Sequence, residues 1–92
     1  MDFEWDREKA ESNFLKHQIT FHEACEVFCD PLAKIKDYIE QDDTDEFRSM
    51  IAGCTMNLKL LIVVFTERAL RIRIISARAA TWKERKEYED QR

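Results

Sequence analysis

The chain contains little of what would indicate a membrane, secreted or disordered protein. Its 92 residues include one glycine and one proline, and 45% are hydrophobic, which is typical of a globular domain. No apolar run approaches the roughly 20 residues that cross a bilayer, and the acidic N-terminus is unlike a signal peptide. Internal repeats, low-complexity tracts and linkers are also missing. We therefore predict a single soluble, cytoplasmic domain over residues 1–92.

Cysteine is scarce as well. The three thiols are Cys25, Cys29 and Cys54, and an odd number without a secretion signal argues against a disulfide framework. Cys25 and Cys29 lie four residues apart on an expected helix, and His22 lies one turn earlier, so these side chains can share a face. A zinc site normally needs a fourth ligand, for which Cys54 is a weak candidate. We expect small core thiols and neither a metal nor a cofactor.

The net charge of −4 is unevenly distributed along the chain. Residues 1–46 hold 14 acidic and 5 basic side chains, whereas residues 47–92 hold 5 acidic and 10 basic ones. A basic half on a net-acidic protein is compatible with nucleic-acid binding, although the acidic half weakens nonspecific attraction. The same basic surface is compatible with an acidic protein segment. Charge alone leaves both partners open.

Much of the positive charge falls on residues 60–78, LLIVVFTERALRIRIISAR. The segment predicts two apolar strands joined by a short turn, because Val, Ile and Phe fill the first run. Arginine is costly on such a surface unless it has an anionic partner, and guanidinium groups on rigid strands can pair with phosphate oxygens. RNA is therefore the leading ligand hypothesis. The arginines of this segment are Arg68, Arg71, Arg73 and Arg78.

Strict alternation along the second of these strands predicts two faces. It places Arg78 on the face of Ile72, opposite Arg71 and Arg73. An ion pair with an acid of the last helix, such as Glu84, competes with a catalytic role for Arg78. Arg71 and Arg73 have a simple alternative role, which is to solvate the outer face, and we favour it for Arg71.

The first half of the chain predicts a short strand over residues 3–5 and a helix over residues 7–17. Asp6 precedes this helix and can cap it. Spacings of four and three residues define the side of the helix that faces the core. The residues on that side are Ala10, Phe14 and His17.

Two capping boxes mark the other helices. Residues 20–23, Thr-Phe-His-Glu, begin a second helix, which ends before Asp30 because Pro31 follows. Residues 81–84, Thr-Trp-Lys-Glu, begin a C-terminal helix that runs to about Asp90.

The middle of the chain predicts further strands. Residues 33–39 form an expected edge strand, residues 40–46 hold five acids and predict an exposed loop, and residues 47–52 form a strand that ends near Gly53. The order β-α-α-β-β-β-β-α indicates the α+β class, with a mainly antiparallel sheet, two N-terminal helices and one C-terminal helix. The edge strand turns three side chains to one face: Lys34, Lys36 and Tyr38.

Two long motifs resemble the signature of the BrnT family, and the match runs from about residue 3 to residue 89. The first motif comprises Phe3-Glu4-Trp5-Asp6, Lys9, Asn13, Lys16-His17, Phe21, Glu23-Ala24, Val27-Phe28 and Asp30-Pro31. The second comprises Val63-Val64-Phe65-Thr66-Glu67-Arg68, Arg73-Ile74-Ile75-Ser76-Ala77-Arg78, Glu84-Arg85 and Tyr88-Glu89. Residues 34–46 match poorly, although Glu46 and Arg48 fit an E-x-R element.

The resemblance implies the toxin of a bacterial type II toxin–antitoxin pair. It implies a RelE-like fold and an enzyme that cuts RNA without a metal and halts translation. It also implies a BrnA-like antitoxin partner with a ribbon-helix-helix part. The complex would repress its own operon, touch DNA only through the antitoxin, and contain a possible toxin dimer.

Metal-free RNA cleavage needs a base for the ribose 2′-hydroxyl, cationic donors for the pentavalent phosphate and an acid for the leaving oxygen. We assign the donors to Arg48, Arg68 and Arg78, on or beside neighbouring strands. His17 is the natural acid or base, although a histidine at a helix end often only caps carbonyls. Glu67 is an alternative base. Candidate RNA contacts are Lys16, Arg73, Arg85 and Tyr88, of which Tyr88 is an alternative acid or a packing residue.

A second hypothesis comes from another class of protein. In it the chain is a catalytically inactive binding module whose basic surface holds an antitoxin-like protein and helps to repress DNA. The acidic pI of about 5.2 and the lack of an obvious acid–base pair favour this alternative.

The two tryptophans also allow two interpretations. Aromatic rings stack on bases in RNA sites. In a domain of this size a tryptophan more often packs in the core, which we favour for Trp5. For Trp82 both interpretations stay open.

Overall fold

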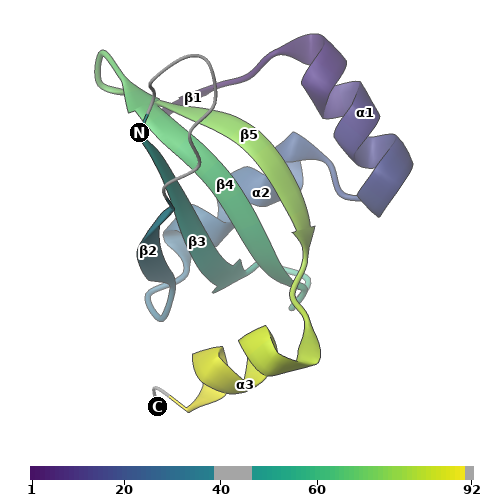
Figure 1. Ribbon diagram of the computed structural model, residues 1–92, viewed down its shortest axis with the longest axis vertical. Helices are drawn as coiled ribbons and strands as arrows, with labels where there is room; N and C mark the ends of the chain where they lie inside the picture. Colours follow the sequence, from purple (N-terminus) through teal and green to yellow (C-terminus); the bar gives the residue numbers. More distant parts are fainter. Residues whose placement is uncertain (39–46, 91–92) are drawn as a thin grey trace.

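The structure is a computed structural model that describes residues 1–38 and 47–90 (Figure 1). The predicted acidic loop at 40–46 lies outside the described residues. The predicted order of elements is confirmed, with one added 3-10 turn, η1. The elements are β1 (Asp2–Glu4), α1 (Arg7–His17), α2 (Phe21–Glu26), η1 (Val27–Cys29), β2 (Lys34–Tyr38), β3 (Arg48–Cys54), β4 (Leu60–Arg68), β5 (Arg71–Ala79) and α3 (Trp82–Glu89).

The five strands form one mixed sheet in the order β1-β5-β4-β3-β2. The pairs β2–β3, β3–β4 and β4–β5 are antiparallel, whereas β1 runs parallel to β5. The prediction of a mainly antiparallel sheet in an α+β fold is therefore right for four strands, and β2 is an edge strand as expected. The parallel pair joins strands that lie far apart in the sequence, so no local pattern could indicate it.

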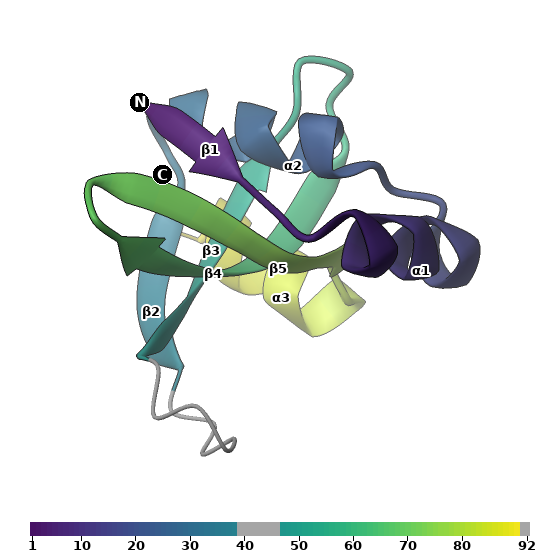
Figure 2. The same cartoon turned by 90° about the horizontal axis from the view of Figure 1, so that it is seen from above.

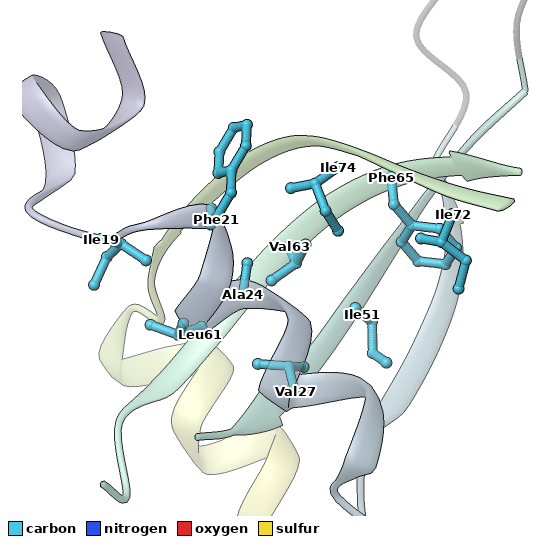
Figure 3. Close-up of a cluster of buried hydrophobic side chains, with 11 residues drawn as sticks. Ile19, Phe21, Ala24, Val27, Ile51, Leu61, Val63, Phe65, Ile72 and Ile74 are labelled. Atoms are coloured by element: carbon cyan, nitrogen blue, oxygen red, sulfur yellow. The ribbon is translucent and has the colours of Figure 1, made fainter. Parts of the chain in front are cut away.

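The helices lie on both faces of the sheet. Figure 2 shows α2 on one side and α3 on the other, whereas α1 lies beside the end of β5. The buried core fills the space between α2 and the sheet (Figure 3). Its members are Ile19, Phe21, Ala24, Val27, Ile51, Leu61, Val63, Phe65, Ile72, Ile74 and Ala77. Trp5 packs against this cluster with its ring edge-on to Phe21, which confirms the core interpretation of this tryptophan.

The boundaries of α1 are as predicted, but its buried side is not. Phe14 is 45% exposed and His17 is exposed, whereas Asn13 is buried. The side-chain amide of Asn13 donates to the Ala77 carbonyl at 2.8 Å and to the Ile19 carbonyl at 3.2 Å, and it accepts from the Ala77 N–H at 3.0 Å. These bonds turn the Asn13 side of the helix toward β5. The predicted inward position of Phe14 and His17 is therefore wrong.

Both predicted capping boxes are present. Thr20 and Glu23 cap α2, and Thr81 and Glu84 cap α3. Asp6 occupies the cap position of α1, but its side chain makes no capping hydrogen bond. The predicted cap residues therefore mark the starts of all three helices. Only the capping hydrogen bond of the Asp6 side chain is missing.

Gly53 lies inside β3 rather than at its end. An added Cβ atom would stand 2.7 Å from Cγ1 of Val27, 3.1 Å from the Val27 carbonyl oxygen and 3.2 Å from Cβ of Ala33. The glycine is thus required by the close approach of η1 to the strand, not by a turn. This explains why β3 continues to Cys54, beyond the predicted end.

The cysteines follow the core interpretation only in part. Cys25 packs partly buried against the core, and burial raises the pKa of its thiol to about 11. Cys29 is exposed, so the prediction is wrong for this residue. Within residues 1–38 and 47–90, His, Cys, Asp and Glu side chains nowhere form a group of three or more that could hold a metal ion. Among the described helices, none has the length and hydrophobicity needed to cross a membrane.

Candidate functional site

A β-bulge in β5 decides where the arginines point. Val64 pairs with Ser76 and Phe65 pairs with Ile74, so Ile75 is an extra residue in β5. Alternation therefore shifts by one at this point. Ile74 and Ala77 are both buried in the core, and Arg78 faces the other side of the sheet.

The predicted position of Arg78 is therefore wrong. Arg78 does not share the face of Ile72 but lies on the same face as Arg71 and Arg73. The simple alternation rule fails because it counts Ile75 as a regular strand residue.

One face of the sheet consequently collects the cations of four strands. This face is opposite α2, and α3 covers one end of it (Figure 2). We call it the basic face. Its cationic residues are Lys34, Lys36, Arg48, Arg68, Arg71, Arg73 and Arg78. The edge strand β1 adds two acids to it, Asp2 beside Arg71 and Glu4 beside Arg73.

The arginines of the basic face form two groups. Arg68 pairs directly with Arg71 at the β4–β5 turn, and Arg73 pairs with Thr66 one row further in. Arg48 precedes the Ser49–Phe65 pair and so flanks the same row from β3. Arg78 pairs with Ile62, four residues of β4 away from Thr66, which is about 13 Å along the strand. The structure thus brings Arg48, Arg68 and Arg73 near one another and places Arg78 apart.

Acidic neighbours hold the guanidinium groups of Arg73 and Arg78. Nη1 of Arg73 lies 2.7 Å from a Glu4 oxygen. Arg78 donates from Nη1 and Nη2 to the two oxygens of Glu84 at 2.7 and 2.9 Å, which is the ion pair that competes with catalysis in the sequence interpretation. The hydrogen bonds from Arg78 lower the pKa of Glu84 to about 2. Glu84 therefore stays ionised near neutral pH and is a poor proton acceptor.

A groove separates α1 from the bulged part of β5, and His17 and Lys16 line it on the helix side. It has a volume of about 190 Å³ and is lined by Lys9, Ser12, Asn13, Lys16, His17, Ile75 and Ser76. The Asn13 bonds to Ala77 fix the distance between its two walls. Ser76 and Arg78 alternate on one face of β5, about 7 Å apart along the strand. Arg73 and Arg78 flank the groove along β5, because their partners Thr66 and Ile62 each lie two residues of β4 from Val64, the partner of Ser76.

Two other predicted site residues, Glu67 and Arg85, lie elsewhere. Glu67 pairs with Ile72 and so falls on the opposite face from Arg68. Arg85 lies on α3, half exposed and 3.9 Å from Glu89. The structure does not bring Glu67 and the basic face together.

Tyr88 is a buried packing residue. Its hydroxyl donates to Oδ2 of Asp30 at 2.6 Å, and the same oxygen accepts from the Cys54 N–H at 2.8 Å. Burial and the hydrogen bond to Asp30 raise the pKa of Tyr88 above its ordinary value of 10. A buried phenol with a raised pKa suits neither RNA contact nor proton donation, so Tyr88 ties α3 to the end of β3.

Sequence reasoning missed three contributors to this region. The burial of Asn13 could not be predicted, because a polar residue beside Phe14 gives no sign of it. Ser76 and Ile75 line the groove only because of the bulge. Lys34 and Lys36 were correctly placed on one face of their strand, but nothing in the sequence indicated that Arg48 and Arg73 share it.

Comparison with known proteins identifies the family. A family model described as the ribonuclease toxin BrnT of type II toxin–antitoxin systems matches residues 5–84. None of the curated proteins matches the chain significantly. Among solved structures, the chain is similar to the ribonuclease toxin BrnT of Brucella abortus, with 26% identity, a TM-score of 0.65, and coverage of 88% of this chain and 97% of that one. The chain therefore belongs to the BrnT family of ribonuclease toxins of type II toxin–antitoxin systems.

Proposed function

We propose that the chain is an endoribonuclease that cleaves RNA without a metal ion and thereby inhibits translation. The observation that carries this proposal is the basic face, which continues along β5 to the groove that holds His17 and Lys16. The membership of the chain in a ribonuclease toxin family supports the same activity. The RelE-like character of the fold and the cytoplasm as the place of action belong to this proposal.

Binding of the RNA backbone is the task of the cations near the β4–β5 turn. Arg48, Arg68 and Arg73 lie in adjacent rows of a rigid sheet, so they offer fixed donors to successive phosphates. Contacts of this kind carry no base specificity but set the register of the strand. Arg85 on α3 extends the cationic surface beyond the sheet.

Cleavage is assigned to the groove beside Arg78. His17 is exposed there and accepts the proton of the ribose 2′-hydroxyl, since imidazole is the side chain suited to proton transfer near neutral pH. The 2′-oxygen then attacks the phosphorus, the bond to the 5′-oxygen breaks, and that oxygen takes a proton from water. Lys16 and Arg78 stabilise the negative charge that develops on the phosphate. Arg78 already binds two oxygens of Glu84 with both Nη atoms, which is the geometry that a phosphate requires. Glu67 has no part in this assignment, since it lies on the other face.

The partner in this proposal is an antitoxin of the BrnA-like, ribbon-helix-helix type. Membership of a type II toxin family implies an antitoxin. A small protein that covers the basic face would exclude RNA, and its own DNA-binding part would carry the complex to the operon. A dimer of the toxin within that complex is part of the same proposal.

The test is RNA cleavage by the purified chain in EDTA, together with its toxicity when expressed in bacteria. We expect cleavage to continue in the chelator. Arg78→Ala and His17→Ala should each lower the cleavage rate by about 10² to 10³, as removal of a transition-state donor or of a general base does. Arg7→Ala is the matched loss of one positive charge, because Arg7 is exposed on α1, where it pairs with Glu11. It should leave the rate unchanged.

Three results would contradict the proposal in whole or in part. A harmless chain that leaves RNA intact would end the enzyme hypothesis. Toxicity that persists in the triple Arg48/Arg68/Arg78→Ala variant would show that the basic face is not the site. Cleavage that stops in EDTA and returns with Mg²⁺ would contradict the metal-independent mechanism alone.

The second candidate function is a noncatalytic module that only pairs with a DNA-binding antitoxin. It is favoured by the internal acids that hold two arginines, Glu4 on Arg73 and Glu84 on Arg78. Tight antitoxin binding by a chain that leaves RNA intact would support this candidate.

A further inference from the structure

The first residue of α3 is an exposed tryptophan. The Trp82 side chain is 76% exposed, although tryptophan is the largest apolar side chain and normally hides most of its ring. Lys86 lies one helical turn further on, and its Nζ atom stands over the indole ring, 5.5 Å from the ring centroid. The lysine contacts one side of the indole plane. The ring therefore presents apolar surface to solvent beside a positive charge.

The surroundings of Trp82 are positively charged. The three acids of α3 each lie in an ion pair, Glu84 with Arg78, Glu87 with Lys36 and Glu89 with Arg85. Within residues 1–38 and 47–90, no ion pair joins Lys83 or Lys86 to an acid. The acids of α3 are thus paired with other bases, and Lys83 and Lys86 remain as positive charges next to Trp82.

Trp82 also lies close to the basic face. Arg78 and Trp82 are four residues apart, and the Arg78–Glu84 pair fixes the first turn of α3 against the end of β5. Figure 1 shows β5 passing directly into this turn. An RNA strand that follows the basic face as far as Arg78 would therefore reach Trp82 next.

We propose that Trp82 and Lys86 form a stacking platform for one unpaired base of the RNA substrate. The base stacks on the open side of the indole ring, and the lysines attract the adjoining phosphates. Only a single-stranded segment suits this platform, because the faces of paired bases are covered within the duplex. The platform depends on the function proposed above, since it requires that the chain bind RNA.

The test uses a single-stranded oligoadenylate of about ten nucleotides, which falls within the range bound by known single-strand folds. Its riboses carry 2′-O-methyl groups, so that it cannot be cleaved, and a fluorescent label reports binding by anisotropy. The variants are Trp82→Leu, which keeps an apolar side chain without a ring, and Trp82→Phe, which keeps a smaller ring. Leu70→Ala is the matched control, because Leu70 is a fully exposed apolar residue at the β4–β5 turn.

We expect Trp82→Leu to weaken binding by roughly 5- to 100-fold, the range that corresponds to loss of one base–aromatic stack. Trp82→Phe should stay within about threefold of the parent, and Leu70→Ala should not change the affinity. The same oligonucleotide annealed to its complement should show no difference between the parent and Trp82→Leu. Trp82 is exposed, so its replacement should leave the fold intact, which a circular dichroism melt checks.

Fluorescence gives a second measurement. In a Trp5→Phe background the indole emission comes from Trp82 alone, and the single-stranded probe should quench it. Equal affinity of the parent and Trp82→Leu, with RNA cleavage intact, would overturn the platform and leave the proposed function standing. A parent that binds no RNA would overturn both. If Trp82→Leu weakened only the binding of a protein partner, the ring would belong to that interface and the platform would also be wrong.

Discussion

Arg78 and Glu84 form a two-point ion pair that joins the last strand to the last helix. The two Nη atoms of Arg78 lie 2.7 and 2.9 Å from the two carboxylate oxygens of Glu84. One of these oxygens also accepts the Thr81 N–H at 2.9 Å and so completes the capping box of α3. A single carboxylate therefore holds the end of β5, the start of α3 and the guanidinium group that we assign to phosphate binding.

The first prediction concerns pH. The folded-state pKa of Glu84 is lowered from 4.5 to about 2, so the stabilisation is fully present above about pH 4.5 and is lost as the pH falls through 2. Because the pair is partly exposed, we expect a contribution of only about 1 kcal/mol. Urea unfolding should show Glu84→Gln less stable than the parent by that amount at pH 7 and equal to it near pH 2. Glutamine keeps the capping oxygen.

The control for this measurement is Glu8→Gln, which removes an exposed carboxylate from the first turn of α1. Its free energy of unfolding should differ little from that of the parent at pH 7 and near pH 2. A gap between the parent and Glu84→Gln that does not change with pH would show that the ion pair is not its source.

The second prediction concerns Asn13. Asn13→Ala removes three hydrogen bonds and leaves the Ala77 N–H and two carbonyl oxygens unsatisfied in a buried position. We expect a loss of about 3 kcal/mol in the free energy of unfolding. Ser12→Ala, at the exposed neighbouring position, should change it by less than about 0.5 kcal/mol. Similar values for the two variants in urea titrations would mean that the Asn13 amide does not hold α1 on β5.

The third prediction concerns the β4–β5 turn. Ala69 and Leu70 both have positive φ, 45° and 71°, which is the conformation of a type I′ turn and is unfavourable for residues with a Cβ atom. Asn-Gly at these positions should stabilise the protein by about 1 to 2 kcal/mol and raise Tm by several degrees. Leu70→Ala removes the exposed side chain but keeps the strain, so it should leave Tm nearly unchanged. Equal gains from both variants would rule out backbone strain as the cause.

The fourth prediction separates packing from catalysis. Tyr88→Phe removes the 2.6 Å hydrogen bond to Asp30 and should cost about 1 to 2 kcal/mol of stability. It should leave the rate of RNA cleavage unchanged at a temperature where both proteins are folded. A cleavage rate lowered a hundredfold or more, in a variant with the expected stability, would show that Tyr88 acts as the acid in catalysis.

Local signals predicted the helices well. The Thr20 and Thr81 capping boxes and the proline after Asp30 act within a few residues, so they are legible in the sequence and hold in the structure. The arginine-bearing strands could also be predicted, because arginine on apolar strands is unusual. The interpretation of Trp5 as a core residue required only its size and the small domain.

The predictions that failed depend on contacts between distant segments. Asn13 is buried because the Ala77 backbone, 64 residues away, needs its hydrogen bonds. Gly53 stays inside a strand because η1 passes close to it. Arg78 lies on the face opposite to the predicted one because β5 has one residue more than β4 at the bulge. That residue is Ile75, and its side chain is typical of a regular strand, so the sequence does not mark the bulge.

The extra residue at Ile75 also sets which side chains of β5 face the core. If Ile75 took a regular place in the strand, every residue after it would shift by one against β4, which would turn the Arg78 guanidinium toward the core and the Ala77 methyl group to the opposite face. Deletion of Ile75, by contrast, would restore regular alternation and leave the pairs Phe65–Ile74 and Val64–Ser76 as they are. Homologous chains can therefore lose this position from the strand, but they cannot keep it without a bulge unless both faces of the sheet are rebuilt.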